Sequence, residues 1–336
     1  MKRKTAAWSL GGVLLSSLIA ASPEAVAQAP TSELLRFERS FDAMGTTYIV
    51  AAYGLDRFRM EAAIDEAFEE VRRVDQLLSN YRKDSEWSQI NQRAATAPVP
   101  LSEESFALIA RCLDYSRSSE GAFDITVGPL MKLWGFFRGQ GRIPHRAEIR
   151  SVLGRIGYQH IQLDAKQKTI RFLRPGMEID PGGIGKGYVV DRMADILRRK
   201  GVSSALISAG RSSIYAIGAP PQEPRGWTVA IPHPRDSRKQ LTEYFLRNES
   251  MSTSGTSEKF FVVGGTTYSH IMDPRTGMPA RGVLSVSVIA PKTLDSEAWT
   301  KPFFVQGRQW TARHKPKEFR VFLCEDRTEN PCVSLP

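Results

Sequence analysis

The sequence lacks the short motifs that mark several common enzyme classes. Across its 336 residues neither GxGxxG nor GxxxxGK[ST] occurs, so neither standard nucleotide fingerprint applies. A GxSxG elbow is absent, which leaves a serine hydrolase without a visible nucleophile. The five histidines form no i,i+4 pair, so the pattern gives no support to zinc chemistry.

Cysteine is also scarce, and the three present stand at no metal-ligand spacing. Cys324 and Cys332 flank the turn-rich segment EDRTENP and could join across it as the tip of a hairpin outside the cytoplasm. Cys112 lies in a helical pattern, where a buried small hydrophobe is expected. The spacing therefore favours structural roles for the cysteines.

No apolar run is long enough to make a good membrane anchor. The segment 6–21 is apolar but short and rich in Gly and Ser, and it follows the basic Lys2-Arg3-Lys4. A small-x-small site, Ala25-Val26-Ala27, precedes Gln28. We therefore predict a signal peptide at 1–27 and a mature protein that is periplasmic or otherwise exported, soluble and not integral to a membrane.

The charge is unbalanced but dispersed. Lys and Arg number 46 against 36 Asp and Glu, for a formal net charge of +10. Because no block of basic residues is dense enough to suit nucleic acid, the excess favours a smaller anionic ligand.

Helical and strand patterns alternate irregularly along the chain. Helices are expected at 59–78, 103–118, 189–200 and 293–306, the last until Pro302 interferes. Strands are expected as pairs within 34–52 and 204–218, and singly at 161–163, 169–172, 227–231, 244–246, 260–263, 266–270, 283–290 and 319–324. This order predicts an α+β protein rather than a doubly wound sheet.

The segment EIDPGGIGKGYVVD, residues 178–191, has the strongest chemical signal. Four glycines fall within six residues around Lys186, directly before an amphipathic helix. Such a loop offers backbone N–H donors and the positive end of a helix dipole, so it suits a phosphate or pyrophosphate. A plain strand-to-helix turn is the alternative.

Three further segments each have a chemical and a structural interpretation. SMSTSG, 250–255, is a hydroxyl-rich turn whose structural interpretation is a solvated loop. In YSHIMDPRTGMP, Asp273 could hold His270 in one tautomer as a base, or the segment is a surface β-turn. In LDSEAWTK, Glu297 and Lys301 stand one helical turn apart, as an ordinary ion pair would.

Taken in order, six segments resemble the ApbE family, the FAD:protein FMN transferases. They are AMGTTY, SNYRKDSEWSQIN, GAFDITVGPLMKLWGF, IDPGGIGKGYVVDR, STSG and YSHIMDPRTGMP, and the likeness runs from about 41 to 307. It implies ApbE-like mixed sheets with flanking helices and an FAD site in a cleft between two lobes. A 28–40 extension would precede that domain, and 308–336 would add its C-terminal strand and tail.

The resemblance also implies the chemistry and the residues. The family uses magnesium to split FAD and to attach FMN through a phosphoester to a Thr or Ser of an exported or membrane protein. By likeness, His270 and Asp273 are catalytic, and the Gly183 carbonyl and Glu297 bind magnesium. The implied FAD contacts are Met44, Tyr81, Ala122, Phe123, Asp124, Asp180, Lys186 and Ile271.

Two segments depart from the family pattern. Trp299 fixes a register in which Glu297 replaces the usual aspartate ligand and Lys301 the usual threonine. A charged ammonium cannot bind a metal, so Lys301 either turns away or puts its charge in the metal's place. Thr300 could supply a substitute hydroxyl, but on a helix its side chain points about 100° away from that of Lys301. In SAGRSSIYAIG, Arg211 interrupts a usual glycine pair and adds a cation.

Three functions follow from this pattern. The first is an FAD:protein FMN transferase. The second is an FAD pyrophosphatase that releases FMN and AMP, as some relatives mainly do. The third is an FAD-binding homologue in which Glu297 and Lys301 have impaired catalysis.

Overall fold

One eight-stranded antiparallel sheet organises the chain. The computed structural model describes residues 34–137 and 139–336, so the predicted signal peptide at 1–27 lies outside the described residues. The strand order is β1 (Leu35–Ala43), β2 (Thr46–Gly54), β6 (Ser204–Ala209), β7 (Ser213–Ile217), β10 (Glu249–Gly255), β15 (Val283–Ala290), β16 (Arg320–Glu325) and β17 (Cys332–Leu335). β1 begins inside the segment predicted as an N-terminal extension.

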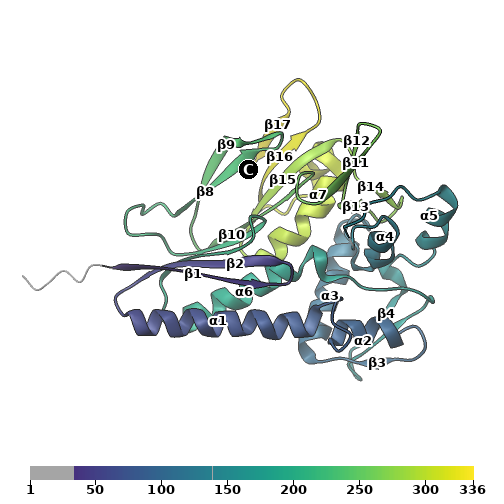
Figure 1. The fold of residues 1–336 in the computed structure, drawn as a ribbon, viewed down its shortest axis with the longest axis horizontal. Coiled ribbons are helices and arrows are strands. Elements are labelled where there is room, and N and C mark those ends of the chain that lie inside the picture. Colours follow the sequence, from purple (N-terminus) through teal and green to yellow (C-terminus); the bar gives the residue numbers. More distant parts are fainter. Residues whose placement is uncertain (1–33, 138) are drawn as a thin grey trace, which may run out of the picture. The chain divides into compact units, whose positions relative to one another are not determined.

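Helices cover one face of this sheet. The α-helices are α1 (Arg57–Leu78), α2 (Glu86–Arg93), α3 (Glu103–Ser118), α4 (Gly128–Leu133), α5 (Arg146–Leu153), α6 (Gly185–Arg199) and α7 (Thr293–His314). Figure 1 shows α1 and α6 running together along β1 and β2, and α7 lies against β10 and β15. The mixed α+β class predicted from the sequence is confirmed.

Period-two alternation in the strands builds a core on each face. Val50 and Ala52 of β2 point to the helical side, whereas Ala51 between them points to the other. That second face is covered by the hairpin of β8 (Trp227–His233) and β9 (Asp236–Leu246).

Smaller sheets and 3-10 turns complete the described residues. They are β3 (Val99–Pro100), β5 (Thr169–Phe172) and β4 (Ile161–Asp164) in one sheet, β11 (Phe260–Val263) with β12 (Thr266–Ser269), β13 (Met272–Asp273) with β14 (Met278–Pro279), and the turns η1 (Ile125–Val127), η2 (Tyr158–His160) and η3 (Pro181–Gly183). Among residues 34–137 and 139–336, none of the helices combines the length and apolarity that crossing a membrane requires.

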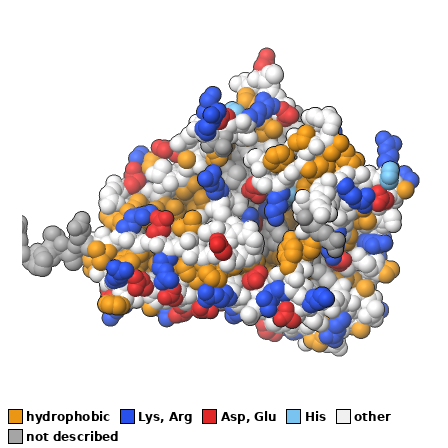
Figure 2. All heavy atoms as spheres, in the orientation of Figure 1, with side chains coloured by type: hydrophobic (Ala, Val, Ile, Leu, Met, Phe, Trp, Pro, Cys, Tyr) orange, Lys and Arg blue, Asp and Glu red, His pale blue; other side chains and the backbone are white. Residues whose placement is uncertain are grey.

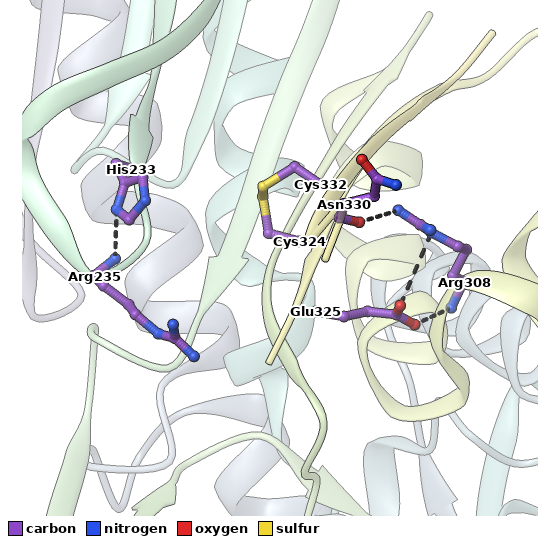
Figure 3. Close-up of a disulfide and its surroundings, with 7 residues drawn as sticks. All are labelled: His233, Arg235, Arg308, Cys324, Glu325, Asn330 and Cys332. Carbon is purple, nitrogen blue, oxygen red and sulfur yellow. Dashed lines mark hydrogen bonds and ion pairs between the residues drawn. A yellow bond between two sulfur atoms is a disulfide. The ribbon is translucent and has the colours of Figure 1, made fainter. Parts of the chain in front are cut away.

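A disulfide closes the C-terminal hairpin, as the spacing suggested. Cys324 of β16 and Cys332 of β17 are directly paired in register and bonded to each other (Figure 3). Beside them, Glu325 accepts a hydrogen bond from the backbone N–H of Arg308 (3.2 Å) and forms an ion pair with its guanidinium (3.9 Å); Arg308 follows the break in α7. Cys112 is fully buried, also as predicted.

Three local predictions were wrong, each because tertiary packing overrode a local signal. The SMSTSG segment is the buried strand β10, not a turn, since its serines bond to α7. Helix α7 passes through Pro302, which packs in the core, and breaks instead at Gly307, where φ is +75°. Helix α6 begins at Gly185, so two of the four glycines belong to its first turn.

Candidate functional site

Two asparagines fix the backbone just before the glycine loop. Ile179 donates its N–H to Asn91 Oδ1 (2.8 Å), and its carbonyl oxygen accepts from Asn80 and Asn91 (3.0 Å each). Asp180 then accepts from the Gly182 amide (2.7 Å) and caps η3. Sequence reasoning missed both asparagines, although each lies in the SNYRKDSEWSQIN segment that it had singled out.

The start of α6 is held by a carboxylate from α7. The Gly187 amide donates to Glu297 Oε2 at 2.5 Å, and Glu297 is almost fully buried. A Cβ on Gly187 would lie 2.5 Å from the Thr293 carbonyl oxygen, so this glycine permits the close approach of two helices. Gly187 is therefore a packing glycine rather than part of a phosphate cradle.

Helix α6 returns a carboxylate to the start of α7. Asp191 accepts from the Thr293 and Leu294 amides at 2.7 and 2.9 Å. Burial raises the pKa of Asp191 to about 6, against the opposing effect of these two bonds. Each of the two helices thus caps the other, which fixes the glycine loop relative to α7.

Lys301 lies against the glycine loop. Its Nζ donates to the backbone carbonyl oxygen of Glu297 at 2.9 Å, and its Cε is 3.7 Å from where a Cβ on Gly183 would lie. Burial lowers the pKa of Lys301 to about 8; the nearby Glu297 opposes this shift and the charge of Lys186 adds to it. The side chain neither turns away from the loop nor forms the predicted ion pair with the Glu297 carboxylate.

The donor groups present do not fit a magnesium ion at Gly183. The Glu297 carboxylate faces the Gly187 amide, and Lys301 rather than Glu297 is the α7 side chain next to Gly183. Thr300 is buried and bonds to Ser254 Oγ (2.8 Å), so its hydroxyl does not replace a ligand. Within the described part of the chain, no three His, Cys, Asp or Glu side chains gather to hold a metal. The predicted Gly183–Glu297 magnesium set is not supported.

His270 follows β12 and is held by a backbone carbonyl. Its Nδ1 lies 3.1 Å from the Lys259 carbonyl oxygen, which fixes the proton on Nδ1 and leaves the Nε2 lone pair free. Burial lowers the pKa of His270 to about 4; the Lys259 carbonyl opposes this shift, whereas the charges of Lys301, Lys259 and Lys186 add to it. The imidazole is therefore neutral at pH 7.

Asp273 does not orient this histidine, contrary to the prediction. Its carboxylate accepts from the Arg275 backbone N–H (3.0 Å), Nε (2.9 Å) and Nη2 (3.0 Å). The prediction failed because an arginine two residues on offers a bidentate partner inside the same turn. The acidic group nearest His270 Nε2 is Glu258, at 3.9 Å, which sequence reasoning did not identify.

Cations from separate elements converge on this region. Lys186, in the first turn of α6, donates to the Ser212 hydroxyl in the turn between β6 and β7. The neighbouring Arg211 is exposed at that turn. Elsewhere on the face shown in Figure 2, basic side chains are interspersed with acidic ones. The local positive charge suits a small anion, in line with the sequence analysis.

Met44 reaches the same loop from the β1–β2 hairpin. It occupies the left-handed region (φ +53°) in a two-residue turn with Gly45. The Tyr48 hydroxyl donates to Met44 Sδ at 3.2 Å, and Met44 Cε is 3.3 Å from where a Cβ on Gly185 would lie. A two-residue hairpin turn needs φ > 0 at both central residues, so this turn sets the position of Met44 beside the loop.

The remaining predicted contacts surround the loop in different ways. Tyr81 is largely exposed and stacks on Phe137, with ring centroids 4.4 Å apart. Ala122, Phe123 and Ile271 are buried, and Phe123 packs against Gly183.

Asp124 points inward. Its carboxylate accepts from the Thr126 amide and hydroxyl (2.8 and 2.7 Å) and from the Tyr158 amide (2.8 Å). These bonds tie two turns together, so its carboxylate is engaged within the protein.

Comparisons with known proteins agree with one another. The model of the ApbE family matches residues 44–322. The FAD:protein FMN transferase of Klebsiella pneumoniae is 34% identical over 79% of this chain and 80% of that protein. That of Salmonella typhimurium is 31% identical over 86% and 82%.

Solved structures give the same result. The ApbE protein of Thermotoga maritima superposes with a TM-score of 0.80 at 29% identity, over 88% of this chain and 98% of that one. The flavin transferase ApbE from Vibrio cholerae gives 0.78 at 25% identity, over 90% and 97%.

Proposed function

The chain belongs to the ApbE family, and we propose on that premise that it is an FAD:protein FMN transferase. It splits FAD and attaches FMN by a phosphoester to a Thr or Ser of an exported or membrane flavoprotein. The observation that carries this proposal is His270, a neutral imidazole with Nε2 free, set among the charges of Lys186 and Lys301.

His270, Lys186 and Lys301 each have a defined role in the transfer reaction. The acceptor hydroxyl oxygen attacks the FMN-side phosphorus of FAD while its proton passes to His270 Nε2. The bond from that phosphorus to the bridging oxygen breaks, and AMP leaves with the electron pair. Lys186 and Lys301 offset the charge that develops on the phosphate oxygens.

Several residues fit roles in binding FAD. Met44 and the exposed Tyr81 offer a thioether and an aromatic face for the flavin ring system. Asp180 shapes the glycine loop, and Lys186 supplies a cation to the diphosphate. Four buried residues support the site through packing and backbone geometry: Ala122, Phe123, Asp124 and Ile271.

A protein acceptor is favoured by the hairpin that leads to His270. Strands β11 and β12 form a two-stranded sheet, and Phe260, Val262 and Val263 of β11 are about half exposed. Exposed apolar side chains beside the proposed base suit contact with another polypeptide. We also propose that the mature chain is exported after cleavage near Gln28. The Cys324–Cys332 disulfide supports export, because disulfides persist in oxidising compartments outside the cytoplasm.

The test uses the purified mature protein, FAD and a panel of exported candidate acceptors with exposed Thr or Ser residues, with and without magnesium. We expect a protein-bound fluorescent flavin and one AMP per flavin attached. FMN and AMP without a labelled acceptor would instead establish the pyrophosphatase. FAD binding without either product would establish the impaired homologue, and His270→Asn serves as the inactive control.

A further inference from the structure

We propose that the ammonium of Lys301 takes the position of a divalent cation and binds the diphosphate of FAD directly, so that nucleotide binding needs no metal. This inference rests on the proposed function, because it assigns a group to the FAD of that reaction. Three independent features of the structure carry it.

The first is the environment of the ammonium itself. Lys301 Nζ bonds to one backbone carbonyl oxygen, that of Glu297, and lies next to Gly183 in the loop. In the described part of the chain it forms no ion pair with a carboxylate within 4.0 Å. An ammonium has three N–H donors, so two remain for an anionic ligand at the loop. The carboxylates of Glu297 and Glu258 act on this buried cation from beyond ion-pair distance, so an anion that binds directly to it would stabilise it further.

The second feature is the disposition of the oxygen ligands that a metal would need. Glu297 Oε2 is bonded to the Gly187 amide, at the start of a 15-residue helix. The Thr300 hydroxyl is bonded to Glu297 O (2.7 Å) and to Ser254. Glu297 Oε2 and the Thr300 hydroxyl are thus both engaged within the protein, and Lys301 is the α7 side chain next to Gly183. A cation brought beside Lys301 would meet its positive charge without compensating ligands.

The third feature is the second cation. Lys186 projects from the first turn of α6 and donates to the Ser212 hydroxyl, and it belongs to the same glycine loop that Lys301 contacts at Gly183. Two ammonium groups from different helices thus lie at one loop, as the charge of a diphosphate would require. Lys301 is thereby a substrate-binding residue that replaces a metal rather than a damaged metal ligand.

The experiment measures FAD affinity by flavin fluorescence, without acceptor, in EDTA and in magnesium. Wild-type protein should bind FAD equally in both. Lys301→Met should weaken binding by between about 10- and 100-fold in EDTA, the loss expected for one charge-assisted contact, and magnesium should not restore it. Lys301→Arg keeps the charge and should retain most of the affinity.

Lys317→Met is the matched control, because Lys317 is an exposed lysine in the segment after α7 and has no part in the site. It should leave the affinity within about twofold, and circular dichroism verifies that each variant is folded. Wild-type binding that disappears in EDTA and returns with magnesium overturns the role of Lys301 alone. Unchanged affinity in a folded Lys301→Met does the same. A wild-type protein that binds no FAD under either condition overturns the proposed function as well.

Discussion

The Glu297 carboxylate and the Gly187 amide lie 2.5 Å apart, and this contact joins the two helices that form the site. It places a buried negative charge at the N-terminus of α6, where the helix dipole stabilises it. It also withdraws that carboxylate from any ligand at Gly183. The same contact thus fixes the loop geometry and leaves Lys301 as the α7 group that faces the loop.

Gly187→Ala should destabilise the protein. The new methyl group would lie 2.5 Å from the Thr293 carbonyl oxygen and 2.9 Å from Glu297 Oε2, so α6 and α7 must separate. We expect a loss of about 1–3 kcal/mol in the free energy of unfolding, measured in urea. Gly255→Ala is the control, because its nearest neighbour is 3.6 Å away. Equal stability of the two variants would contradict the helix-packing role.

Asn91→Ala should destabilise the backbone at Ile179, directly before the glycine loop. The change removes the partner of the Ile179 N–H and one of the two donors to its carbonyl oxygen, and Ile179 is itself fully buried. We expect about 1–3 kcal/mol lower stability and weaker FAD binding. Gln92→Ala removes only an exposed contact with Lys83 (3.4 Å) and should change neither quantity. A stable Asn91→Ala variant with wild-type FAD affinity would show that the hydrogen bonds between Asn91 and Ile179 are not needed.

The pH dependence of stability should reveal the buried neutral His270. Its pKa is about 4 in the folded protein and near 6.5 when unfolded, so between these values the unfolded chain binds the proton first. Stability is therefore lost as the pH falls from about 6.5 to about 4, by up to about 3 kcal/mol from this group.

Comparing unfolding free energies of wild type and His270→Gln at pH 7 and pH 4.5 isolates that contribution. The difference between the two proteins should shift in favour of the variant at the lower pH. His145→Gln, at an exposed position, controls for general loss of a histidine. A difference that does not change with pH would mean that His270 is protonated as readily in the folded state as in the unfolded chain.

Removal of the disulfide should lower stability without affecting the site. Cys324 and Cys332 are eight residues apart, so the disulfide closes a short loop in the unfolded chain. This constraint raises the free energy of unfolding by about 2–3 kcal/mol. The double variant Cys324→Ser, Cys332→Ser should show this loss in thermal melts under oxidising conditions. Its FAD affinity at low temperature should match wild type. Reduced affinity would indicate that β17 contributes to the site.

Much of the fold was predictable because period and register are local signals. The β1–β2 hairpin, α1, α3 and β15 all appear where the alternation of apolar residues predicted them. Strand β10 was not predicted, because serines at alternating positions are typical of a solvated segment. Their hydroxyls bond to Ser296 and Thr300 of α7 and to the Ala290 carbonyl of β15, partners that lie 40 or more residues further along the chain.

The site could be located from the sequence, but the partners of its charged groups could not. Met44 and Lys301 lie against the glycine loop, and the charges of Lys186 and Lys301 act on His270, whereas the roles assigned to these residues stay predictions. The hydrogen-bond partners of the carboxylates were not predicted. Asp124, Asp273 and Glu297 each bond to backbone amides or to an arginine, and those partners are determined by tertiary geometry that spacing does not encode.

The most direct test of the account is the mass of an acceptor protein after incubation with wild-type enzyme and FAD in EDTA. We predict that the acceptor gains the mass of one FMN phosphoester, that AMP is released in equal amount, and that Lys301→Met strongly reduces both at an FAD concentration that does not saturate the variant. A gain that appears only when magnesium is supplied would contradict the metal-free site. No gain under either condition, with any acceptor, would contradict the assignment as a transferase.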